Sequence, residues 1–274
     1  MKSIGIPYHP HNYLEDYLFK IQSYGRYSFT LPELKTQFNQ SEKAILQSLF
    51  RLKKIGKVAQ IRKSFYVIVP PEYAATGTLP PVLFIDDLMK FLKRNYYVCL
   101  QSAAALHGAA HQQPQEFFVI IEKPMLRKIS TEKLKLNFVV KKCLPLNCLE
   151  NKKSDTGFFK ISSPELTAID LVQYQLKTGG LNNVVTILQE LAEVITPNKI
   201  SNCVDSAIAT TTLQRLGYIF DKVLQNQKLS NAIENILKSK STTPVPLKLN
   251  GKRHGFNINK KWMIIENVTL ESDL

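Results

Sequence analysis

The sequence predicts an α+β protein with two domains. Short strand-like and helical stretches alternate over the first 70 residues, and a proline-rich segment follows at residues 70–81. Beyond it, apolar strands and then a run of helices predict a larger mixed α/β domain, with a small sheet and a helical bundle-like part. A chain of 274 residues is long enough for one large domain or, more often, for two.

The first domain is expected to begin with two helices around a brief strand. An apolar stripe at helical spacing marks residues 11–24 as a helix, and Gly25 follows as a stop signal. Residues 27–30 alternate like a strand. Thr30, with Glu33 three positions later, forms a capping-box pattern that predicts the start of a second helix.

A third helix is predicted from its N-cap Ser41 to about Ile55, with Gly56 as the stop signal. Its apolar face comprises Ile45, Leu49, Leu52 and Ile55, whereas the opposite face carries Lys43, Gln47, Arg51 and Lys54. A helix of this kind buries one side and is suited to lie in the major groove of DNA. There Gln reads adenine, Arg reads guanine and Lys holds phosphates.

The stretches KVAQI and SFYVIV after Gly56 predict a hairpin with a basic tip. The order helix, strand, helix, turn, basic helix and basic hairpin is typical of a winged helix-turn-helix, which we place at residues 1–72. The alternative is a small α+β domain whose basic helix is merely solvated. The expected DNA-binding residues are Ser41, Lys43, Gln47, Arg51, Lys54, Lys57, Arg62 and Lys63.

The net charge of +14 gathers in three windows. Residues 41–63 and 123–142 each hold seven basic residues and one acidic residue, and residues 238–261 hold seven basic residues and no acidic one. The rest of the chain is net acidic. Positive charge in patches suits phosphate binding, whereas solubility alone does not require it.

The second and third windows predict a further basic surface. Some of its residues flank a turn between two predicted strands, and others follow Asn250-Gly251, which is a hairpin signal. The surface either extends the DNA footprint or presents a site for RNA or an acidic partner. Its residues are Lys123, Arg127, Lys128, Lys133, Lys135, Lys252 and Arg253.

The segment PPEYAATGTLPP holds four prolines and one glycine, which indicates a connector. We place the linker at residues 73–81 and the larger domain at residues 82–274. A helix is expected to begin that domain, and the small residues at 102–105 predict a helix that a neighbour can approach closely. The stretches EFFVII, LNFVVKK and GFFKIS are expected to form the small sheet.

Helices dominate the remainder. Ser163 as N-cap and Pro164 at the first helical position begin one of them. Trp262 alternates with Ile264 in a late strand, which favours a core position over stacking on a base. The other expected elements are helices near 181–195, 199–209 and 212–225, the helix LSNAIENIL, and the strands PLKLNG and KKWMIIENV.

Four motifs of the larger domain occur in a characteristic order: YYVCLQSAAALHG, ISSPELTAIDLVQY, LQRLGYIFD and GFNINKKWMIIEN. With the strand between the first two, they resemble the abortive-infection AbiEi antitoxin family of bacterial transcriptional regulators, over roughly residues 25–268. In that family a winged helix-turn-helix precedes a larger α/β domain. The resemblance also implies that Ser163, Pro164, Glu165 and Asp170 form a structural corner.

The resemblance implies a type IV toxin–antitoxin system of phage defence. The protein would repress its own two-gene operon, and its toxin would be nucleotidyltransferase-like. Its partners would be double-stranded DNA of its own promoter, with repeated half-sites, and the toxin, countered without a stable complex. The protein would be a monomer or a weak dimer in solution.

The sequence does not indicate an enzyme, a metal site or a cofactor. It has no Walker loop, no G-x-S-x-G and no C-x-x-C. His107 and His111 are four apart, but the helix is expected to end there without a third ligand, so a structural role is favoured. Asp86 and Asp87 lie at a predicted helix start, where acids complement the helix dipole.

The protein is expected in the cytoplasm. The N-terminus lacks the apolar core of a signal peptide, and no stretch approaches the roughly 20 apolar residues that span a bilayer. The cysteines are therefore expected to be reduced and mostly buried. They are Cys99, Cys143, Cys148 and Cys203.

Two other functions stay open. The chain could be an interaction protein whose basic patches bind RNA or a toxin, without sequence-specific DNA binding. It could also hold a nuclease or nucleotidyltransferase in residues 82–268, which would require clustered carboxylates where the sequence has only scattered ones.

Overall fold

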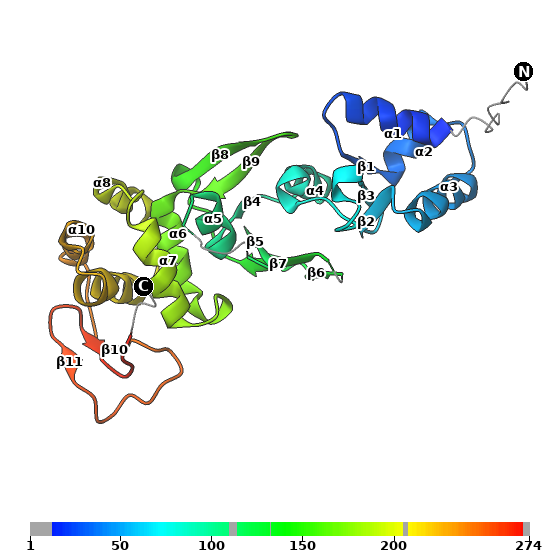
Figure 1. Ribbon diagram of the computed structural model, residues 1–274. Helices are drawn as coiled ribbons and strands as arrows, with labels where there is room; N and C mark the ends of the chain where they lie inside the picture. Colours follow the sequence, from blue (N-terminus) through cyan, green and yellow to red (C-terminus); the bar gives the residue numbers. More distant parts are fainter. Residues whose placement is uncertain (1–12, 110–113, 132, 205–207, 271–274) are drawn as a thin grey trace, which may run out of the picture. The chain divides into compact units, whose positions relative to one another are not determined.

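The computed structural model describes residues 13–109, 114–131, 133–204 and 208–270 (Figure 1). His9, His11 and His111 lie outside the described residues. The chain divides into two compact units. The smaller unit comprises Met1–Lys93, Ile129–Leu134 and Lys153–Phe158, and the larger unit comprises Arg94–Lys128, Lys135–Lys152 and Phe159–Leu274.

The smaller unit combines short helices with an antiparallel sheet whose strand order is β1-β3-β2. The strands β2 and β3 are joined at Lys63 and Ser64, where Ser64 has a φ of 64°. Its elements are α1 (Tyr13–Ser23), β1 (Ser28–Thr30), α2 (Leu31–Gln37), α3 (Glu42–Lys54), β2 (Val58–Arg62), β3 (Phe65–Ile68) and α4 (Ile85–Phe91).

Side-chain caps begin two of these helices as the sequence predicts. Both halves of the Thr30–Glu33 capping box are present. The Ser41 Oγ accepts a hydrogen bond from the Ala44 N–H at 3.2 Å, which caps α3. The predicted starts of α2 and α3 are therefore confirmed, because each is specified by a few adjacent residues.

The core of the smaller unit lies between its helices and its sheet. α3 contributes the buried residues Ile45, Leu49 and Leu52, as expected. Ile55 was expected on the same apolar face, but that prediction is wrong, because its side chain is 60% exposed. Ile55 is the C-cap of the helix, and ten positions after Ile45 it lies about 80° round the helix axis from that residue, at the margin of the buried stripe.

The helix α4 belongs to the smaller unit, whereas the sequence predicts that the larger domain begins at residue 82. The Ser28 hydroxyl donates to an Asp87 carboxylate oxygen at 2.6 Å. The rings of Phe65 and Phe91 lie 5.6 Å apart. These long-range contacts join α4 to the smaller unit, whose first segment extends to Lys93.

The larger unit contains most of a six-stranded sheet with the order β6-β7-β5-β4-β9-β8. β5 runs parallel to β7 and antiparallel to β4, and β4 pairs with β9 in parallel. The strands are β4 (Tyr96–Val98), β5 (Phe117–Ile121), β6 (Ile129–Ser130), β7 (Lys135–Val140), β8 (Leu149–Ser154) and β9 (Gly157–Ser162).

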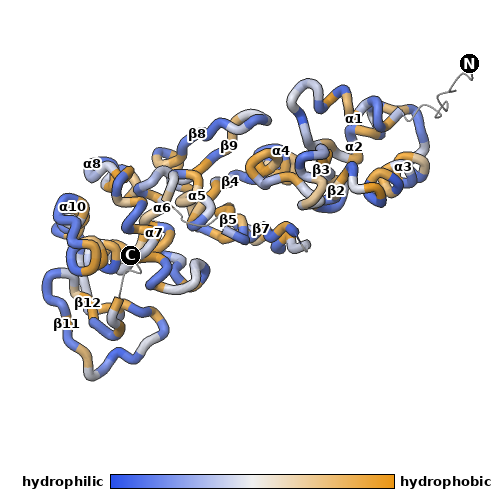
Figure 2. The backbone as a smooth tube through the Cα atoms, viewed as in Figure 1, coloured by the Kyte–Doolittle hydropathy of each residue, from blue (hydrophilic) through white to orange (hydrophobic). Residues whose placement is uncertain are grey.

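The predicted strands correspond to β5, β7 and β9, whereas β4, β6 and β8 were not predicted. β8 has the sequence LENKKS, which lacks apolar alternation, and Figure 2 shows it as mostly hydrophilic. β4 spans only three residues. Such strands are specified by their sheet partners rather than by their own pattern.

Helices pack with this sheet into one extended core that runs from β4 and β5 to α10. Ser163 caps α6 as expected, with its Oγ accepting from the Leu166 N–H, and every residue of α6 from Glu165 to Val172 is buried. The helices are α5 (Leu100–Leu106), α6 (Pro164–Gln173), α7 (Leu181–Leu191), α8 (Pro197–Ile200), α9 (Thr210–Tyr218) and α10 (Gln227–Leu237). A π-helical turn, Ile219–Val223, continues α9. The expected mixed α+β class is confirmed.

A small sheet follows with the order β10-β12-β11, from β10 (Val245–Pro246), β11 (Ile258–Asn259) and β12 (Ile264–Ile265). The hairpin predicted at Asn250-Gly251 is wrong, because β10 pairs in parallel with β12 and the hairpin partners are β11 and β12. The Asn267 side-chain amide instead donates to the carbonyls of Lys248 and Lys252. These two hydrogen bonds hold together the loop that contains Asn250-Gly251.

Trp262 lies in the core, as predicted, with 1% of its surface exposed. Its indole N–H donates to an Asp221 carboxylate oxygen at 2.9 Å. The ring packs against Gly217, where an added Cβ would lie 2.1 Å from it. A glycine is therefore required at this contact.

The cysteine prediction is wrong in two respects. Cys148 and Cys203 form a disulfide, and Cys143 is exposed, whereas Cys99 is buried and free as expected. The two bonded residues lie 55 positions apart, and the fold brings their Cα atoms to 5.5 Å, a separation usual for a disulfide. The sequence contained no local signal for this pairing.

His107 has the structural role that the sequence favours, since its Nε2 lies in hydrogen-bond contact with the Ser162 carbonyl at 2.8 Å. Among the residues described, no helix has the length and apolar character needed to cross a membrane.

Candidate nucleic-acid interface

The exposed face of α3 carries the residues expected to contact DNA. Lys43, Gln47, Arg51 and Lys54 are all exposed, and their side chains make no hydrogen bond or ion pair within the described part of the chain. Spacings of four, four and three residues keep them along one side of the helix. The opposite side is fixed in the core, so the structure presents this polar side on a rigid support.

The hairpin tip places two more of the expected residues at the end of β2. Lys63 is exposed and Arg62 is partly exposed. The Leu31 N–H donates to the Ser64 carbonyl at 2.9 Å, so the tip is bonded to the start of α2. A tip held in this way keeps its basic residues at a fixed place in the smaller unit.

Two expected contact residues are already engaged. The Ser41 side chain accepts from the Ala44 N–H in the cap of α3. The Lys57 ammonium pairs with a Glu15 carboxylate oxygen at 2.6 Å, which joins the segment before β2 to α1. Their hydrogen-bonding groups are therefore less available to a ligand than those of the exposed α3 residues.

Phe50 is the main feature of this face that sequence reasoning missed. Its side chain is 67% exposed, and Leu46 beside it is 41% exposed. Helical geometry puts Phe50 close to the line that joins Lys43, Gln47 and Lys54. The signal was present in the sequence, because position 50 lies three residues from 47 and four from 54 on the polar stripe.

A hydrogen-bonded group ties α1 to α2 behind this face. The Glu33 carboxylate accepts from the Tyr17 hydroxyl at 2.6 Å and from the Arg26 guanidinium at 2.5 and 2.6 Å. Burial acts to raise the pKa of Glu33, but the hydrogen bonds from Arg26 and Tyr17 outweigh it and hold this pKa below its usual range. Burial and the hydrogen bond to Glu33 raise the pKa of Tyr17 to about 12.

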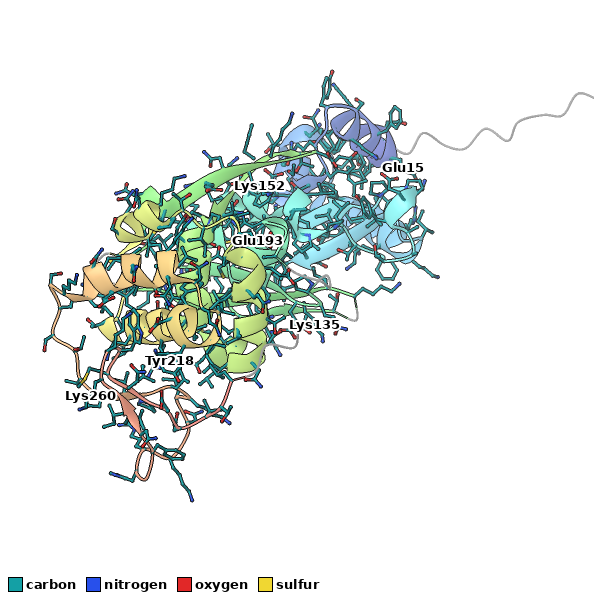
Figure 3. All side chains as sticks on the ribbon, turned by 60° about the vertical axis from the view of Figure 1, so that its left-hand side comes forward. Glu15, Lys135, Lys152, Glu193, Tyr218 and Lys260 are labelled. Atoms are coloured by element: carbon teal, nitrogen blue, oxygen red, sulfur yellow. A yellow bond between two sulfur atoms is a disulfide. The ribbon has the colours of Figure 1, made fainter. Side chains whose placement is uncertain are left out.

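The residues of the predicted further basic surface come from several separate segments of the chain. Lys123, Arg127 and Lys128 lie in the segment between β5 and β6, and Lys135 lies in β7. The Lys133 ammonium donates to the Ala75 carbonyl at 2.6 Å within the smaller unit. Lys252 and Arg253 belong to the loop before β11, and Figure 3 shows Lys260 of that region far from Lys135 of the sheet.

One basic residue of the second charge window lies in the core rather than on the surface. The Lys141 ammonium contacts an Asp170 carboxylate oxygen at 2.7 Å, and both side chains are almost completely buried. The Tyr97 hydroxyl donates to the other oxygen at 2.8 Å. Burial, reinforced by the Asp170 charge, raises the pKa of Tyr97 well above its usual range. In the sequence, the sign of this buried pair was a single acidic residue, Asp170, within the apolar stretch AIDLV.

The remaining acids that the sequence singled out are also engaged. Asp86 pairs with Lys90 at 2.6 Å, and Glu165 accepts from the Thr196 N–H at 2.9 Å. In the part of the chain that the structure describes, no three histidine, cysteine, aspartate or glutamate residues cluster as metal ligands would.

Comparison with solved structures identifies a likeness over nearly the whole chain. The RV2827C protein from Mycobacterium tuberculosis matches with a TM-score of 0.65 and 13% sequence identity, over 94% of this chain and 92% of that one. At this identity the likeness shows the fold alone. An antigenic nucleotidyltransferase-like protein from Paracoccidioides brasiliensis matches with a TM-score of 0.31 and 11% identity, over 58% of this chain and 86% of that one. A likeness that slight carries no argument.

No curated protein sequence matches the chain. The family model of the AbiEi antitoxin C-terminal domain, however, matches residues 96–222. This range begins at β4, includes α5, α6 and α7, and ends in the π-helical turn that follows α9. The family expected from the sequence motifs is therefore confirmed by this match, which covers residues 96–222.

Proposed function

We propose that this protein is a DNA-binding repressor of its own toxin–antitoxin operon and a type IV antitoxin. The observation that carries the repressor proposal is the exposed polar side of α3, whose opposite side is fixed in the core of the smaller unit. The element order α1, β1, α2, α3, β2 and β3, with the sheet order β1-β3-β2, supports a winged helix-turn-helix.

In this proposal α3 enters the major groove. Gln47 reads adenine and Arg51 reads guanine, while Lys43 and Lys54 hold phosphates. Arg62 and Lys63 at the hairpin tip contact the backbone beside the groove. Ser41 and Lys57 contribute less than the sequence suggested, because their polar groups already have partners. Repeated half-sites would each take one molecule, so that the protein pairs on DNA and stays a monomer or weak dimer in solution.

The antitoxin part of the proposal rests on the AbiEi domain of the larger unit. We propose a role without enzymatic turnover, in the cytoplasm, against a nucleotidyltransferase-like toxin and without a stable complex between the two proteins. The exposed residues Arg127 and Lys128 are the first candidates for this activity among the predicted basic residues.

A reporter placed behind the upstream region of the gene tests the repressor proposal. Wild-type protein is expected to lower transcription, and Gln47→Ala or Arg51→Ala is expected to restore most of it. Lys228→Ala, an exposed lysine on α10 of the larger unit, is the matched control and should repress like the wild type. Unchanged repression by both α3 variants would contradict the proposed reading helix.

Coexpression with the neighbouring toxin gene tests the antitoxin proposal. Rescue of growth is expected to survive Gln47→Ala when the toxin is driven by a foreign promoter, because neutralisation is assigned to the larger unit. The charge reversal Arg127→Glu with Lys128→Glu is expected to impair that rescue. Undiminished rescue by this double variant would remove both residues from the proposal.

A further inference from the structure

A buried cation without a counter-charge lies at the end of β10 in the larger unit. Arg215 of α9 is 6% exposed, and it forms no ion pair within the described part of the chain. Its Nε donates to the Pro246 carbonyl at 2.9 Å, and its Nη1 donates to the Thr211 carbonyl at 3.2 Å. Both acceptors are neutral. Because buried arginines are usually paired with an acid, the charge of Arg215 is left for another group to match.

The Arg215 guanidinium is oriented and partly open. The hydrogen bonds to the two carbonyls fix its plane. Its Nη2 atom has no hydrogen-bond partner among the described residues and still reaches solvent. Arginine presents its N–H groups in a rigid fork that matches the oxygens of a phosphate. The open side of this fork is therefore suited to an anion that arrives from outside.

A second arginine lies near the first. Burial and the nearby charge of Arg253 lower the pKa of Arg215, so the two cations act on each other. The chain that carries Arg253 turns back toward β10, because the Asn267 amide donates to the carbonyls of Lys248 and Lys252 at 3.1 and 3.0 Å. Neighbouring arginines repel each other, and a bound anion would relieve this repulsion.

Glu266 does not neutralise the two arginines. Its carboxylate accepts from the Tyr218 hydroxyl at 3.0 Å, one helical turn beyond Arg215, and it forms no ion pair in the residues that the structure describes. Burial and this hydrogen bond raise the pKa of Tyr218 to about 12, so the hydroxyl remains a donor at neutral pH. One carboxylate that is already bonded leaves the positive charge of both arginines in place.

The basic loop, residues 247–257, connects β10 to β11 and contains no acidic residue. The side chains of Lys252 and Arg253 are exposed and have no partner within the described ranges. Phe256 follows them and is 42% exposed. Cations that hold the backbone, beside an exposed aromatic ring that stacks on a base, are typical of surfaces that bind single-stranded nucleic acid.

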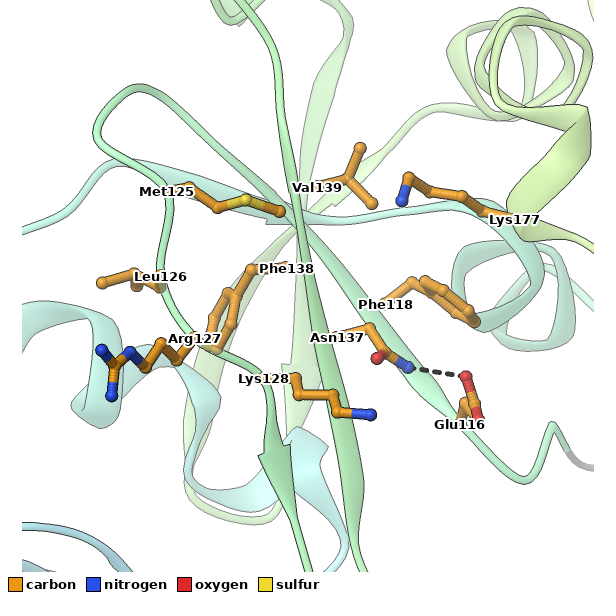
Figure 4. Close-up of a pocket in the computed structure, with 10 residues that line it drawn as sticks. All are labelled: Glu116, Phe118, Met125, Leu126, Arg127, Lys128, Asn137, Phe138, Val139 and Lys177. Carbon is orange, nitrogen blue, oxygen red and sulfur yellow. Dashed lines mark hydrogen bonds between the residues drawn. The ribbon is translucent and has the colours of Figure 1, made fainter.

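Another group of basic residues in the larger unit provides a contrast. Lys128 and Lys177 line a pocket of ≈ 530 Å³ beside β5 and β7 (Figure 4). The Glu116 carboxylate lines the same pocket and accepts from the Asn137 amide at 2.7 Å. Exposed lysines near a carboxylate require no added anion. Arg215 differs from them because it is buried and has no acid beside it among the described residues.

We propose that Arg215 and Arg253 hold a phosphate of a single-stranded nucleic acid, and that Phe256 stacks on one of its bases. Lys252 then contacts a neighbouring phosphate. A free inorganic anion would leave Phe256 unused, and a duplex keeps its bases stacked inside the helix, away from the ring. The inference concerns the larger unit alone, goes beyond the proposed repressor and antitoxin, and does not depend on DNA binding by α3.

Fluorescence anisotropy of labelled oligonucleotides with the full-length protein tests this site. The single-stranded probes are oligouridylate, oligoadenylate and oligodeoxythymidylate, and an unrelated duplex and inorganic polyphosphate are compared with them. Arg253→Ala and Arg215→Met are each expected to weaken strand binding roughly tenfold. Phe256→Leu is expected to weaken it about fivefold or more and to leave polyphosphate binding unchanged. Binding of either the RNA or the DNA strands supports the site, and the tighter of the two identifies the kind of strand.

Two variants serve as matched controls. Lys228→Ala removes a positive charge from α10, and Leu176→Ala removes an exposed apolar side chain of the larger unit. Both are expected to leave strand binding unchanged. Thermal unfolding of every variant separates a lost site from a lost fold. Arg253→Ala and Phe256→Leu decide the outcome even if Arg215→Met does not fold, because both residues are exposed.

Several results would overturn the proposal. Strand binding that Arg253→Ala and Phe256→Leu both retain in full would place the binding elsewhere on the chain. Weaker polyphosphate binding by Arg253→Ala, with unchanged strand binding by Phe256→Leu, would mean an unspecific anion site. Equal losses for the unrelated duplex and for single strands would mean a duplex footprint. An oligoglutamate that displaces the strand more effectively than unlabelled oligonucleotide would identify a site for an acidic protein.

Discussion

At the scale of single residues, the exposed Phe50 supports the proposal that the polar face of α3 reads DNA sequence. An aromatic side chain that is exposed to water contributes little buried apolar surface to the stability of the protein. The exposed fraction of Phe50, 67%, is high for a phenylalanine in a folded protein. In the major groove the methyl group of thymine offers it an apolar contact. The residue therefore extends the proposed readout beyond hydrogen bonds.

Phe50→Ala is expected to weaken binding to the upstream DNA by about 1 kcal/mol, since one aromatic–methyl contact is lost. Binding to a scrambled duplex should change little. Fluorescence anisotropy with labelled duplexes measures both. Replacing the thymines of the upstream DNA by deoxyuridine removes only their methyl groups and should weaken the wild type but not the variant. Equal losses for both proteins would show that Phe50 does not read methyl groups.

The buried pair of Lys141 and Asp170 belongs to the same scale. Asp170→Ala leaves the Lys141 ammonium buried without its partner, so we expect a loss of about 3–5 kcal/mol in the free energy of unfolding. Urea unfolding followed by circular dichroism measures it. The double variant Lys141→Met with Asp170→Leu removes both charges and should recover most of the loss. A double variant no more stable than Asp170→Ala would contradict this account.

At the scale of elements, the position of α3 depends on how α1 and α2 are joined. Tyr17 and Arg26 meet at Glu33, whose carboxylate also closes the capping box of α2. The rings of Tyr13 and Tyr17 pack edge-on against Phe38, at 4.8 and 5.4 Å between centroids. These contacts fix the turn from which α3 begins.

Because the pKa of Glu33 is lowered in the folded protein, its stabilisation is present above the ordinary value of 4.5 and is lost as the pH falls through the lower folded value. Glu33→Gln is expected to cost about 1 kcal/mol at neutral pH, a modest amount because the group is partly exposed. It should also reduce the loss of stability in acid. Thermal unfolding between neutral pH and pH 3 measures both. The control is Glu72→Gln, and an acid dependence of the Glu33 variant equal to that of the wild type would contradict the assignment.

Elements with local signals could be predicted from the sequence. The caps at Thr30, Ser41 and Ser163 and the tip between β2 and β3 each depend on a few adjacent residues. The strand β8 could not, because LENKKS has no apolar pattern and pairs only once β9 is present. The hairpin predicted at Asn250-Gly251 does not form, because β10 pairs in parallel with β12 and not with the strand that follows the turn.

At the scale of the whole molecule, the features that the sequence left unpredicted join distant positions. The disulfide joins residues 55 apart, and the Lys141–Asp170 pair joins residues 29 apart. Within the candidate site, the exposed residues of α3 could be predicted, because residues three or four positions apart lie on the same face of a helix. The partners of Ser41 and Lys57 and the burial of Arg215 could not, since they arise from packing.

In our proposal, the smaller of the two units reads DNA and the larger unit carries the antitoxin activity. The central claim is that the smaller unit reads sequence rather than charge alone. It is tested by the affinity of the full-length protein for the DNA upstream of its gene and for a scrambled duplex, at several salt concentrations. We expect the upstream DNA to bind roughly 10³ times tighter, with both affinities falling steeply as salt rises. Gln47→Ala and Arg51→Ala should each remove about 1–3 kcal/mol of the preference. Equal, salt-sensitive binding to both duplexes would contradict the repressor and favour a protein that uses its basic surfaces to bind RNA or a toxin.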